Sequence, residues 1–281
     1  MGRALLASAP QRIWLRACAH VDLDISDART VAAAVSAFAP DLIINAAAYT
    51  AVDKAESEPA AAAAINADGP KFLAQAALDV PGCRLLHIST DYVFDGRKPE
   101  AYRPDDPTGP MSVYGVTKLA GEQAVREILA DRSVILRTAW VYAAAGRNFV
   151  LTMLRLMNER GAVRVVADQW GCPTSADSIA RACWAIGGRP SVHGTLHWTD
   201  AGRASWCDFA RAIAEEALAL GLLPAPVSVT PISTAEYPTP ARRPANSVLE
   251  SQSTVAQIGV TPRPWREELR ATLLRIQAAA A

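Results

Sequence analysis

Short apolar runs alternate with alanine-rich segments through the first half of the chain, and this order limits the fold more than any other feature. The apolar runs at 12–17, 41–48, 83–90 and 133–142 are expected to be strands. The segments 27–40, 58–80 and 112–130 are expected to be helices, the second either continuous or broken near Gly69 and Pro70. Near-continuous apolar strands alternating with helices indicate a parallel sheet covered on both faces. We therefore expect an α/β fold with a doubly wound sheet.

The pattern becomes less regular after Tyr142. A helix and a strand are expected over 148–166, followed by a helix from Asp177, a strand-like GTLHWTD and a helix in SWCDFARAIAEEALAL. The last ~60 residues are rich in proline. This half is more irregular and less periodic than the first, as expected of a specificity domain packed against a nucleotide-binding one. We expect 1–142 to be a dinucleotide-binding domain. Residues 143–281 are expected to be mainly a substrate-binding domain, with some segments returning to the first domain.

Composition excludes several classes of function. Acidic and basic residues balance at 28 each, which argues against a nucleic-acid or membrane-surface partner. The five cysteines are scattered, with no C-x-x-C and no ligand cluster for a metal, and no signal segment opens the chain. No apolar run reaches the roughly 18 residues that a membrane span requires. A reduced, cytoplasmic protein without a metal is expected.

Tyr114 and Lys118 lie four residues apart in a predicted helix, and Thr90 ends the preceding predicted strand. Residues at this spacing share one helix face. Reduction of a carbonyl by a nicotinamide needs a proton from the protein, and a nearby ammonium favours the phenolate of tyrosine and so lowers its pKa. Thr90 could orient the same carbonyl oxygen. The alternative is a surface Tyr and Lys with a Thr that caps a strand.

Longer strings make the pattern specific. The chain carries NAAAYTAVDKAESEP, HISTDYVFDG, VYGVTKLAGE, LRTAWVY, ADQWGCPT and YPTPARRPANSVL. In these segments it resembles the dTDP-4-dehydrorhamnose reductases, which are extended short-chain dehydrogenase/reductases with a Rossmann-like fold. The match runs in order from Gly2 to about Leu249. It implies reduction of the C4 ketone of dTDP-4-dehydro-β-L-rhamnose to dTDP-β-L-rhamnose, a precursor of cell-surface polysaccharide.

The resemblance also assigns roles to residues. It implies that Tyr114 is the proton donor, Lys118 its activator and ribose ligand, and Thr90 the third catalytic group. The cofactor would be bound by Gly2, Arg16, Asp24, Ile25, Asn45, Ala46, Ala47, Ala48, Thr50, Tyr114 and Lys118. The sugar nucleotide would be bound by Thr90, Asp91, Trp140, Arg243 and Asn246.

Simpler structural roles stay open for some of these residues. Trp140 could be a core aromatic between the domains, and Asp24 a residue that precedes a helix. Arg243 and Asn246, with Arg242, suit a diphosphate because guanidinium groups match phosphate oxygens, but they could also form a solvated turn. His87 is interpreted as a packed core histidine, and Cys172 as a small core filler.

The amino-terminal segment MGRALLASAPQ departs from the family pattern. That pattern begins with a strand and G-x-x-G-x-x-G, which places a pyrophosphate at a helix N-terminus. Only its last glycine has a match, Gly2. Two explanations stay open: about a dozen residues lie upstream of Met1, or the shortened chain is real and binds the cofactor poorly or folds badly. The 281-residue chain itself is expected to be a weak or inactive reductase. The missing strand would leave neighbouring strands unpaired.

Cofactor and function also have alternatives. Arg16 lies where an arginine would suit the 2′-phosphate of NADPH, and NADH is the alternative cofactor. The rival functions are a non-catalytic regulatory subunit, like that of methionine adenosyltransferase, and a reductase of another nucleotide-4-keto-sugar. The expected partner is a dTDP-sugar, and a homodimer is considered.

Overall fold

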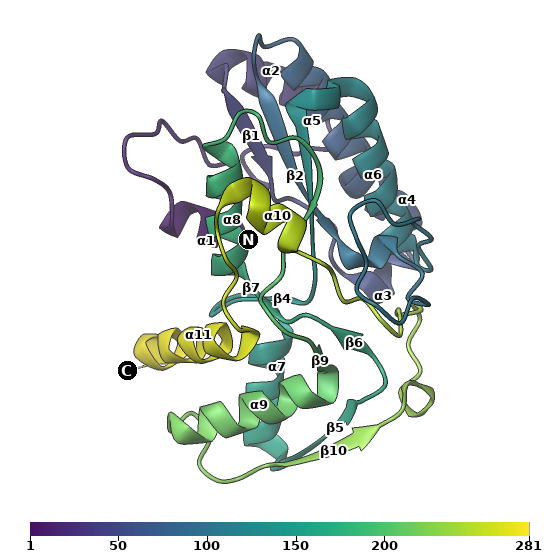
Figure 1. The fold of residues 1–281 in the computed structure, drawn as a ribbon, viewed down its shortest axis with the longest axis vertical. Coiled ribbons are helices and arrows are strands. Elements are labelled where there is room, and N and C mark those ends of the chain that lie inside the picture. The colour runs from purple at the N-terminus through teal and green to yellow at the C-terminus, as the bar shows by residue number, and fades with distance from the viewer. Residues whose placement is uncertain (281) are drawn as a thin grey trace.

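The computed structural model describes residues 1–280, and one half of the molecule is built around a parallel sheet (Figure 1). The sheet has four strands in the order β1-β2-β3-β8, and every neighbouring pair is parallel. Leu42 of the first strand lies opposite Arg84 of the second. The predicted α/β fold with a parallel sheet is confirmed. The strand bounds are β1 (Leu42–Asn45), β2 (Arg84–Thr90), β3 (Ser133–Thr138) and β8 (Gly194–His197).

Helices cover both faces of this sheet, as Figure 1 shows. Because successive side chains of a strand point to opposite faces, Leu85 and Leu86 enter different cores. Leu85 packs with Val125 beneath one helical layer, and Leu86 packs with Ile179 beneath the other. The first layer contains α2 (Ala28–Phe38), α5 (Gly69–Leu78) and α6 (Val113–Leu129). The second contains α1 (Gly2–Ala7), α8 (Ala176–Gly187) and α10 (Gln252–Ile258).

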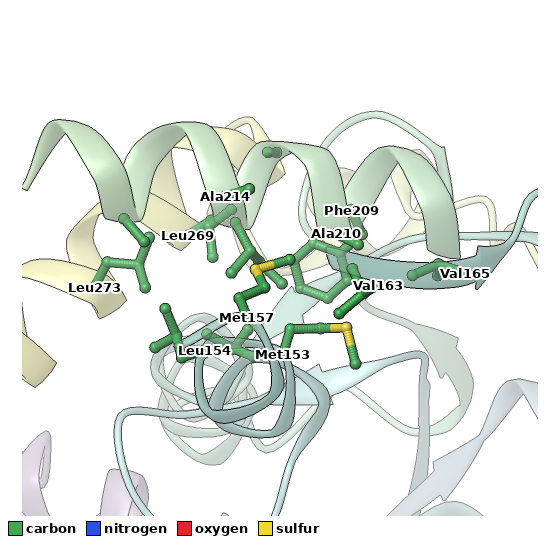
Figure 2. Packing of buried hydrophobic residues seen from close by; sticks show 14 of the residues in the cluster. Met153, Leu154, Met157, Val163, Val165, Phe209, Ala210, Ala214, Leu269 and Leu273 are labelled. Atoms are coloured by element: carbon green, nitrogen blue, oxygen red, sulfur yellow. The ribbon is translucent and has the colours of Figure 1, made fainter. Parts of the chain in front are cut away.

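A separate apolar core lies in the other half of the molecule (Figure 2). There Met153, Met157 and Phe209 pack with Leu269 and Leu273. The elements that supply these residues, or pair beside them, are α7 (Phe149–Arg160), β5 (Ala162–Val166), α9 (Trp206–Ala219), β10 (Ser228–Ile232) and α11 (Trp265–Ala280). Residues 194–197 nevertheless return to the main sheet as β8.

Short elements join the two halves. Two small pairs of strands are β4 (Val141–Tyr142) with β7 (Thr174–Ser175) and β6 (Trp170–Gly171) with β9 (Ala204–Ser205). The remaining helices are α3 (Val52–Ala55), α4 (Pro59–Ala63), η1 (Ala64–Asp68), η2 (Asp91–Val93), η3 (Ala130–Arg132) and η4 (Thr234–Glu236). The segment 58–80, predicted as a helix that is either continuous or broken near Gly69, changes its helix type there. A π-helical turn ends at Asp68 and α5 begins at Gly69.

The prediction of a strand over 12–17 is wrong. These residues are exposed and irregular, and the Trp14 side chain is 92% exposed. Among residues 1–280, β1 pairs only with β2 and no strand lies beside 12–17. A strand needs ladder partners for its backbone N–H and C=O groups, so an apolar run without a neighbouring strand has nothing to pair with.

The predicted strand 133–142 is interrupted. Strand β3 ends at Thr138, and Trp140 has a φ of 48°, in the left-handed region. The chain then resumes as β4, which pairs with β7 rather than with the main sheet. A bulky residue rarely adopts this conformation, so the turn at Trp140 must be held by packing. It directs the chain from the sheet into the second half.

Candidate active site

The predicted catalytic residues lie where the strands of the main sheet end. Thr90 is the last residue of β2, and Tyr114 lies in the first turn of α6. Ser112 caps this helix by accepting a hydrogen bond from the Gly115 N–H at 3.2 Å. A Cβ on Gly115 would lie 2.3 Å from the carbonyl oxygen of Tyr92. Glycine at this position therefore lets α6 approach the turn that follows β2, which brings Tyr114 close to Thr90.

Tyr114 is partly buried beside that turn. Its ring meets the Tyr92 ring edge to face, with centroids 5.5 Å apart. The Thr90 hydroxyl donates to Asp91 Oδ1 at 3.0 Å and accepts from the Tyr92 N–H at 3.3 Å. Burial raises the pKa of Tyr114 to about 12, and a hydrogen bond with Thr90 opposes this shift. Burial also raises the pKa of Asp91 to about 6.

Lys118 is buried one helical turn after Tyr114, but its amine turns to β2. Nζ donates to the Ile88 carbonyl at 2.7 Å and lies 3.2 Å from His87 Nε2. Burial lowers the pKa of Lys118 to about 8, against the opposing effect of the Glu122 charge. The sequence analysis expected the Lys118 ammonium to lower the pKa of Tyr114. In the structure the Lys118 amine contacts His87 and the Ile88 carbonyl instead. The pKa of Tyr114 is raised, and Thr90 is the group that opposes the rise.

A buried ion pair beneath the site was missed by the sequence reasoning. Glu122 of α6 receives hydrogen bonds from the Arg137 guanidinium, with Nη2 to Oε2 at 2.8 Å and Nε to Oε1 at 3.0 Å. Ser89 donates to Glu122 Oε1 at 2.5 Å. Both charged side chains are at most 2% exposed. The network ties α6 to β2 and β3, and so fixes the helix that carries Tyr114. The sequence feature that could have revealed this ion pair is a charged residue at a position where the helix or strand pattern is otherwise apolar.

Asn45 and the small residues after it lie at the end of β1. Asn45 is buried, and its Oδ1 accepts from the Ala47 N–H at 3.1 Å. Ala46, Ala47, Ala48 and Thr50 keep accessible surface. In open α/β sheets ligands bind outside the carboxyl ends of the strands, and small side chains let a ligand approach the backbone. Together with the Lys118 amine, this donor set fits the ribose and nicotinamide end of a dinucleotide.

The other cofactor candidates lie in the amino-terminal segment. Gly2 begins α1 with open space around it, and Arg16 is exposed, with Nη1 donating to the Ala34 carbonyl at 3.5 Å. Asp24 Oδ1 accepts from the Ser26 N–H at 2.9 Å and closes a turn before α2. Ile25 packs on Gly69, where a Cβ would lie 2.6 Å from Ile25 Cδ1. Asp24 and Ile25 thus also have structural roles.

Arg243 reaches across from the second half of the chain. Its Nη2 lies 2.8 Å from Asp53 Oδ2, and Nη1 donates to the Thr239 hydroxyl and to the Ala241 carbonyl. Asp53 belongs to α3, so the pair joins segments from both halves. Burial by itself would lower the pKa of Arg243. The Asp53 partner and nearby Tyr92 outweigh burial, so the pKa is raised overall. Sequence reasoning did not find Asp53.

Two other predicted substrate residues have structural contacts. The Trp140 indole stacks on Trp206 with ring centroids 3.5 Å apart, and a Cβ on Gly171 would lie 2.5 Å from its Nε1. The Asn246 amide nitrogen donates to the carbonyls of Lys98 and Glu100 at 2.7 and 2.9 Å. Trp140 thus serves the packing between the halves, and Asn246 holds the loop after β2.

No three His, Cys, Asp or Glu side chains within residues 1–280 are grouped so that they could hold a metal ion. No helix in this range has the length and apolar character needed to cross a membrane.

Comparison with known proteins assigns the chain to a family. The model of the family described as RmlD substrate binding domain matches residues 1–278. The chain belongs to the RmlD family. A dTDP-4-dehydrorhamnose reductase of Sinorhizobium fredii is 44% identical over 276 residues, which cover 95% of this chain and 91% of the relative. The resemblance inferred from the sequence is confirmed.

Two further proteins are similar to this chain. The crystal structure of dTDP-4-dehydrorhamnose reductase from Bacillus anthracis in complex with NADP has a TM-score of 0.91 and 35% identity, with 98% of this chain and 95% of that one covered. A protein of Streptomyces antibioticus described as a probable dTDP-4,6-dihydroxy-2-methyloxan-3-one 4-ketoreductase is 44% identical over 265 residues, covering 94% of this chain and 87% of that relative.

Proposed function

We propose that this protein reduces the C4 ketone of dTDP-4-dehydro-β-L-rhamnose, with NADPH as cofactor, and yields dTDP-β-L-rhamnose. The observation that carries the proposal is that Tyr114 lies beside Thr90 at the end of β2, with Lys118 one turn later on α6, in a chain of the RmlD family. NADH is the alternative cofactor. The bound cofactor supplies the hydride, and the chain supplies the proton and the positioning.

Tyr114 is the proposed proton donor to O4 of the sugar. A phenol with a pKa near 12 stays protonated at neutral pH, and it is still a stronger acid than the alcohol that forms. The Thr90 hydroxyl is proposed to orient the same oxygen, since a hydroxyl can both donate and accept. Asp91 lies behind Thr90 and holds its hydroxyl through the 3.0 Å hydrogen bond.

The proposed cofactor contacts begin at the end of β1. Lys118 would hold the ribose, and Asn45, Ala46, Ala47, Ala48 and Thr50 would line the cofactor. The pyrophosphate and adenosine end of the cofactor is proposed to contact Gly2, Arg16, Asp24 and Ile25. The sugar nucleotide is proposed to contact Trp140 and Asn246, and family membership is what supports these two contacts.

Arg243→Ala is expected to raise KM for the dTDP-sugar about 10- to 100-fold while KM for NADPH stays unchanged. A charge-assisted hydrogen bond to a diphosphate contributes about 1.5–3 kcal/mol, which corresponds to that range. Arg164→Ala is the matched control, because Arg164 forms an exposed pair with Glu236 at 2.8 Å. Steady-state kinetics with each substrate varied in turn give both constants. An unchanged KM for the dTDP-sugar would show that Arg243 does not bind the diphosphate and that its role is the structural ion pair with Asp53.

The function is tested by NADPH oxidation with purified protein and dTDP-4-dehydrorhamnose. Turnover with formation of dTDP-rhamnose supports the proposal and excludes a purely regulatory subunit. Turnover only with a different dTDP-4-keto-sugar would move the assignment to a sister reductase, such as the Streptomyces antibioticus relative. Absence of turnover with every keto-sugar, in a protein that still binds NADPH, would favour the regulatory alternative.

We further propose a cytoplasmic location, a homodimer, and a division of labour between residues 1–142 and 143–281. The separate cores of the two halves support the division. Cell fractionation and sedimentation measurements test the first two.

A further inference from the structure

Asp53 joins the two halves of the molecule through both of its carboxylate oxygens. It lies on α3 in the first half, and Oδ1 accepts from the Ala241 N–H of the second half at 3.2 Å. Oδ2 accepts from Arg243 Nη2 at 2.8 Å. Burial by itself would raise the pKa of Asp53, but these hydrogen bonds and the Arg243 charge outweigh it, so the pKa is lowered. The carboxylate is therefore ionised at neutral pH, and the proposed function gives it no role.

The hydrogen bonds of Arg243 leave part of its guanidinium free. Nη1 donates to the Thr239 hydroxyl and to the Ala241 carbonyl, and Nη2 donates to Asp53. Because a guanidinium has five N–H donors, Nε–H and the second N–H of Nη2 have no hydrogen-bond acceptor within residues 1–280. Guanidinium N–H groups bind phosphate oxygens strongly, often in pairs. Asp53 and the 239–241 segment thus hold the group while two donors stay available to a ligand.

Tyr92 relates this guanidinium to the candidate active site. The Tyr92 ring contacts the Tyr114 ring edge to face, with centroids 5.5 Å apart. Burial raises the pKa of Tyr92, and the nearby charges of Arg243 and Asp53 act on this pKa in opposite directions. In a dTDP-sugar the diphosphate is attached to C1, across the pyranose ring from C4. A sugar whose O4 meets Tyr114 can therefore extend its diphosphate past Tyr92 towards Arg243.

We propose that Asp53 is a positioning residue, which holds Arg243 ready for the diphosphate of the sugar nucleotide. An arginine side chain loses conformational freedom when it binds a phosphate, and this loss lowers the affinity. The ion pair with Asp53 orders the side chain before the ligand arrives, so a smaller loss accompanies binding. The inference rests on the proposed function, because the dTDP-sugar is the ligand that supplies the diphosphate.

The negative charge of Asp53 would by itself repel a diphosphate. Its side chain is 42% exposed and paired with Arg243, so both water and the guanidinium screen this repulsion. The Arg243 side chain is less exposed, at 23%, and three hydrogen bonds hold it. We therefore expect the ordering of Arg243 to outweigh the repulsion.

Calorimetric titration with dTDP tests the positioning role without turnover. Asp53→Ala is expected to raise the Kd for dTDP about 3- to 10-fold, the range expected when the ligand must order one long side chain. Circular dichroism checks that the variant is folded. Glu236→Ala is the matched control, because Glu236 also accepts from a backbone N–H, that of Ser233, and from a guanidinium, that of Arg164. Its Kd for dTDP should stay within about twofold of the wild-type value.

A double-mutant cycle with Arg243→Ala separates positioning from other effects of Asp53. Without Arg243 there is no side chain to order, so Asp53→Ala should no longer weaken dTDP binding. Repulsion alone would make Asp53→Ala bind dTDP more tightly in both backgrounds. A general structural role would weaken binding in both backgrounds. Only positioning gives a loss that depends on Arg243.

The outcomes distinguish this inference from the proposed function. An unchanged or lower Kd in Asp53→Ala, or an equal loss in the absence of Arg243, would overturn the positioning role. If Arg243→Ala still weakened dTDP binding in that case, Arg243 would remain a diphosphate ligand and the proposed function would stand. A wild-type protein that does not bind dTDP would overturn both.

Discussion

Tyr114→Phe is expected to lower kcat for the dTDP-sugar about 100- to 10,000-fold, the range that a positioned general acid contributes. The phenylalanine ring keeps the edge-to-face contact with Tyr92, so the fold should be preserved. No proton donor remains for the developing alkoxide, whereas the other groups proposed to hold the cofactor are unchanged. Steady-state NADPH oxidation gives kcat, and fluorescence titration gives the dissociation constant of NADPH, which should change less than about twofold.

Tyr142→Phe is the matched control for this variant. It removes a phenol hydroxyl from the other core, where the hydroxyl donates to the Trp265 carbonyl at 3.4 Å. This protein should keep nearly full activity. Normal turnover by Tyr114→Phe would show that Tyr114 is not the proton donor. Equal losses of kcat in both variants would indicate a general structural effect.

Glu122→Ala is expected to lower the free energy of unfolding by about 3–5 kcal/mol. The change leaves the Arg137 guanidinium, only 2% exposed, without its carboxylate partner, and an unpaired buried charge is costly. Ser89 also loses its acceptor. Thermal or urea unfolding followed by circular dichroism measures the loss, and the melting temperature should fall by roughly 6–20 °C.

Glu159→Ala supplies the comparison. Glu159 pairs with Arg155 at 3.0 Å on the surface, with both side chains at least half exposed. Such pairs contribute about 0–1 kcal/mol because water screens them. Equal losses in the two variants would show that the buried pair is not a major source of stability. Glu122→Met combined with Arg137→Met should recover part of the stability, since an apolar pair leaves no charge unpaired.

Local patterns predicted most of the fold and the positions of the candidate catalytic residues on their strand and helix. Apolar runs placed β1, β2 and β3, and the strings around Thr90, Tyr114 and Lys118 placed those residues at a strand end and on one helix face. The strand predicted over 12–17 failed because a strand is defined by its neighbour as well as by its own residues.

The sequence by itself determined the α/β class and the helix face shared by Tyr114 and Lys118, because both follow from periods of a few residues. Only the tertiary structure decided the partners of the charged groups. Arg243 meets Asp53, 190 positions away along the chain, and Lys118 turns to His87 rather than to the phenol. Such contacts depend on how whole helices and strands pack, and packing energy is shared among many residues that no short segment contains.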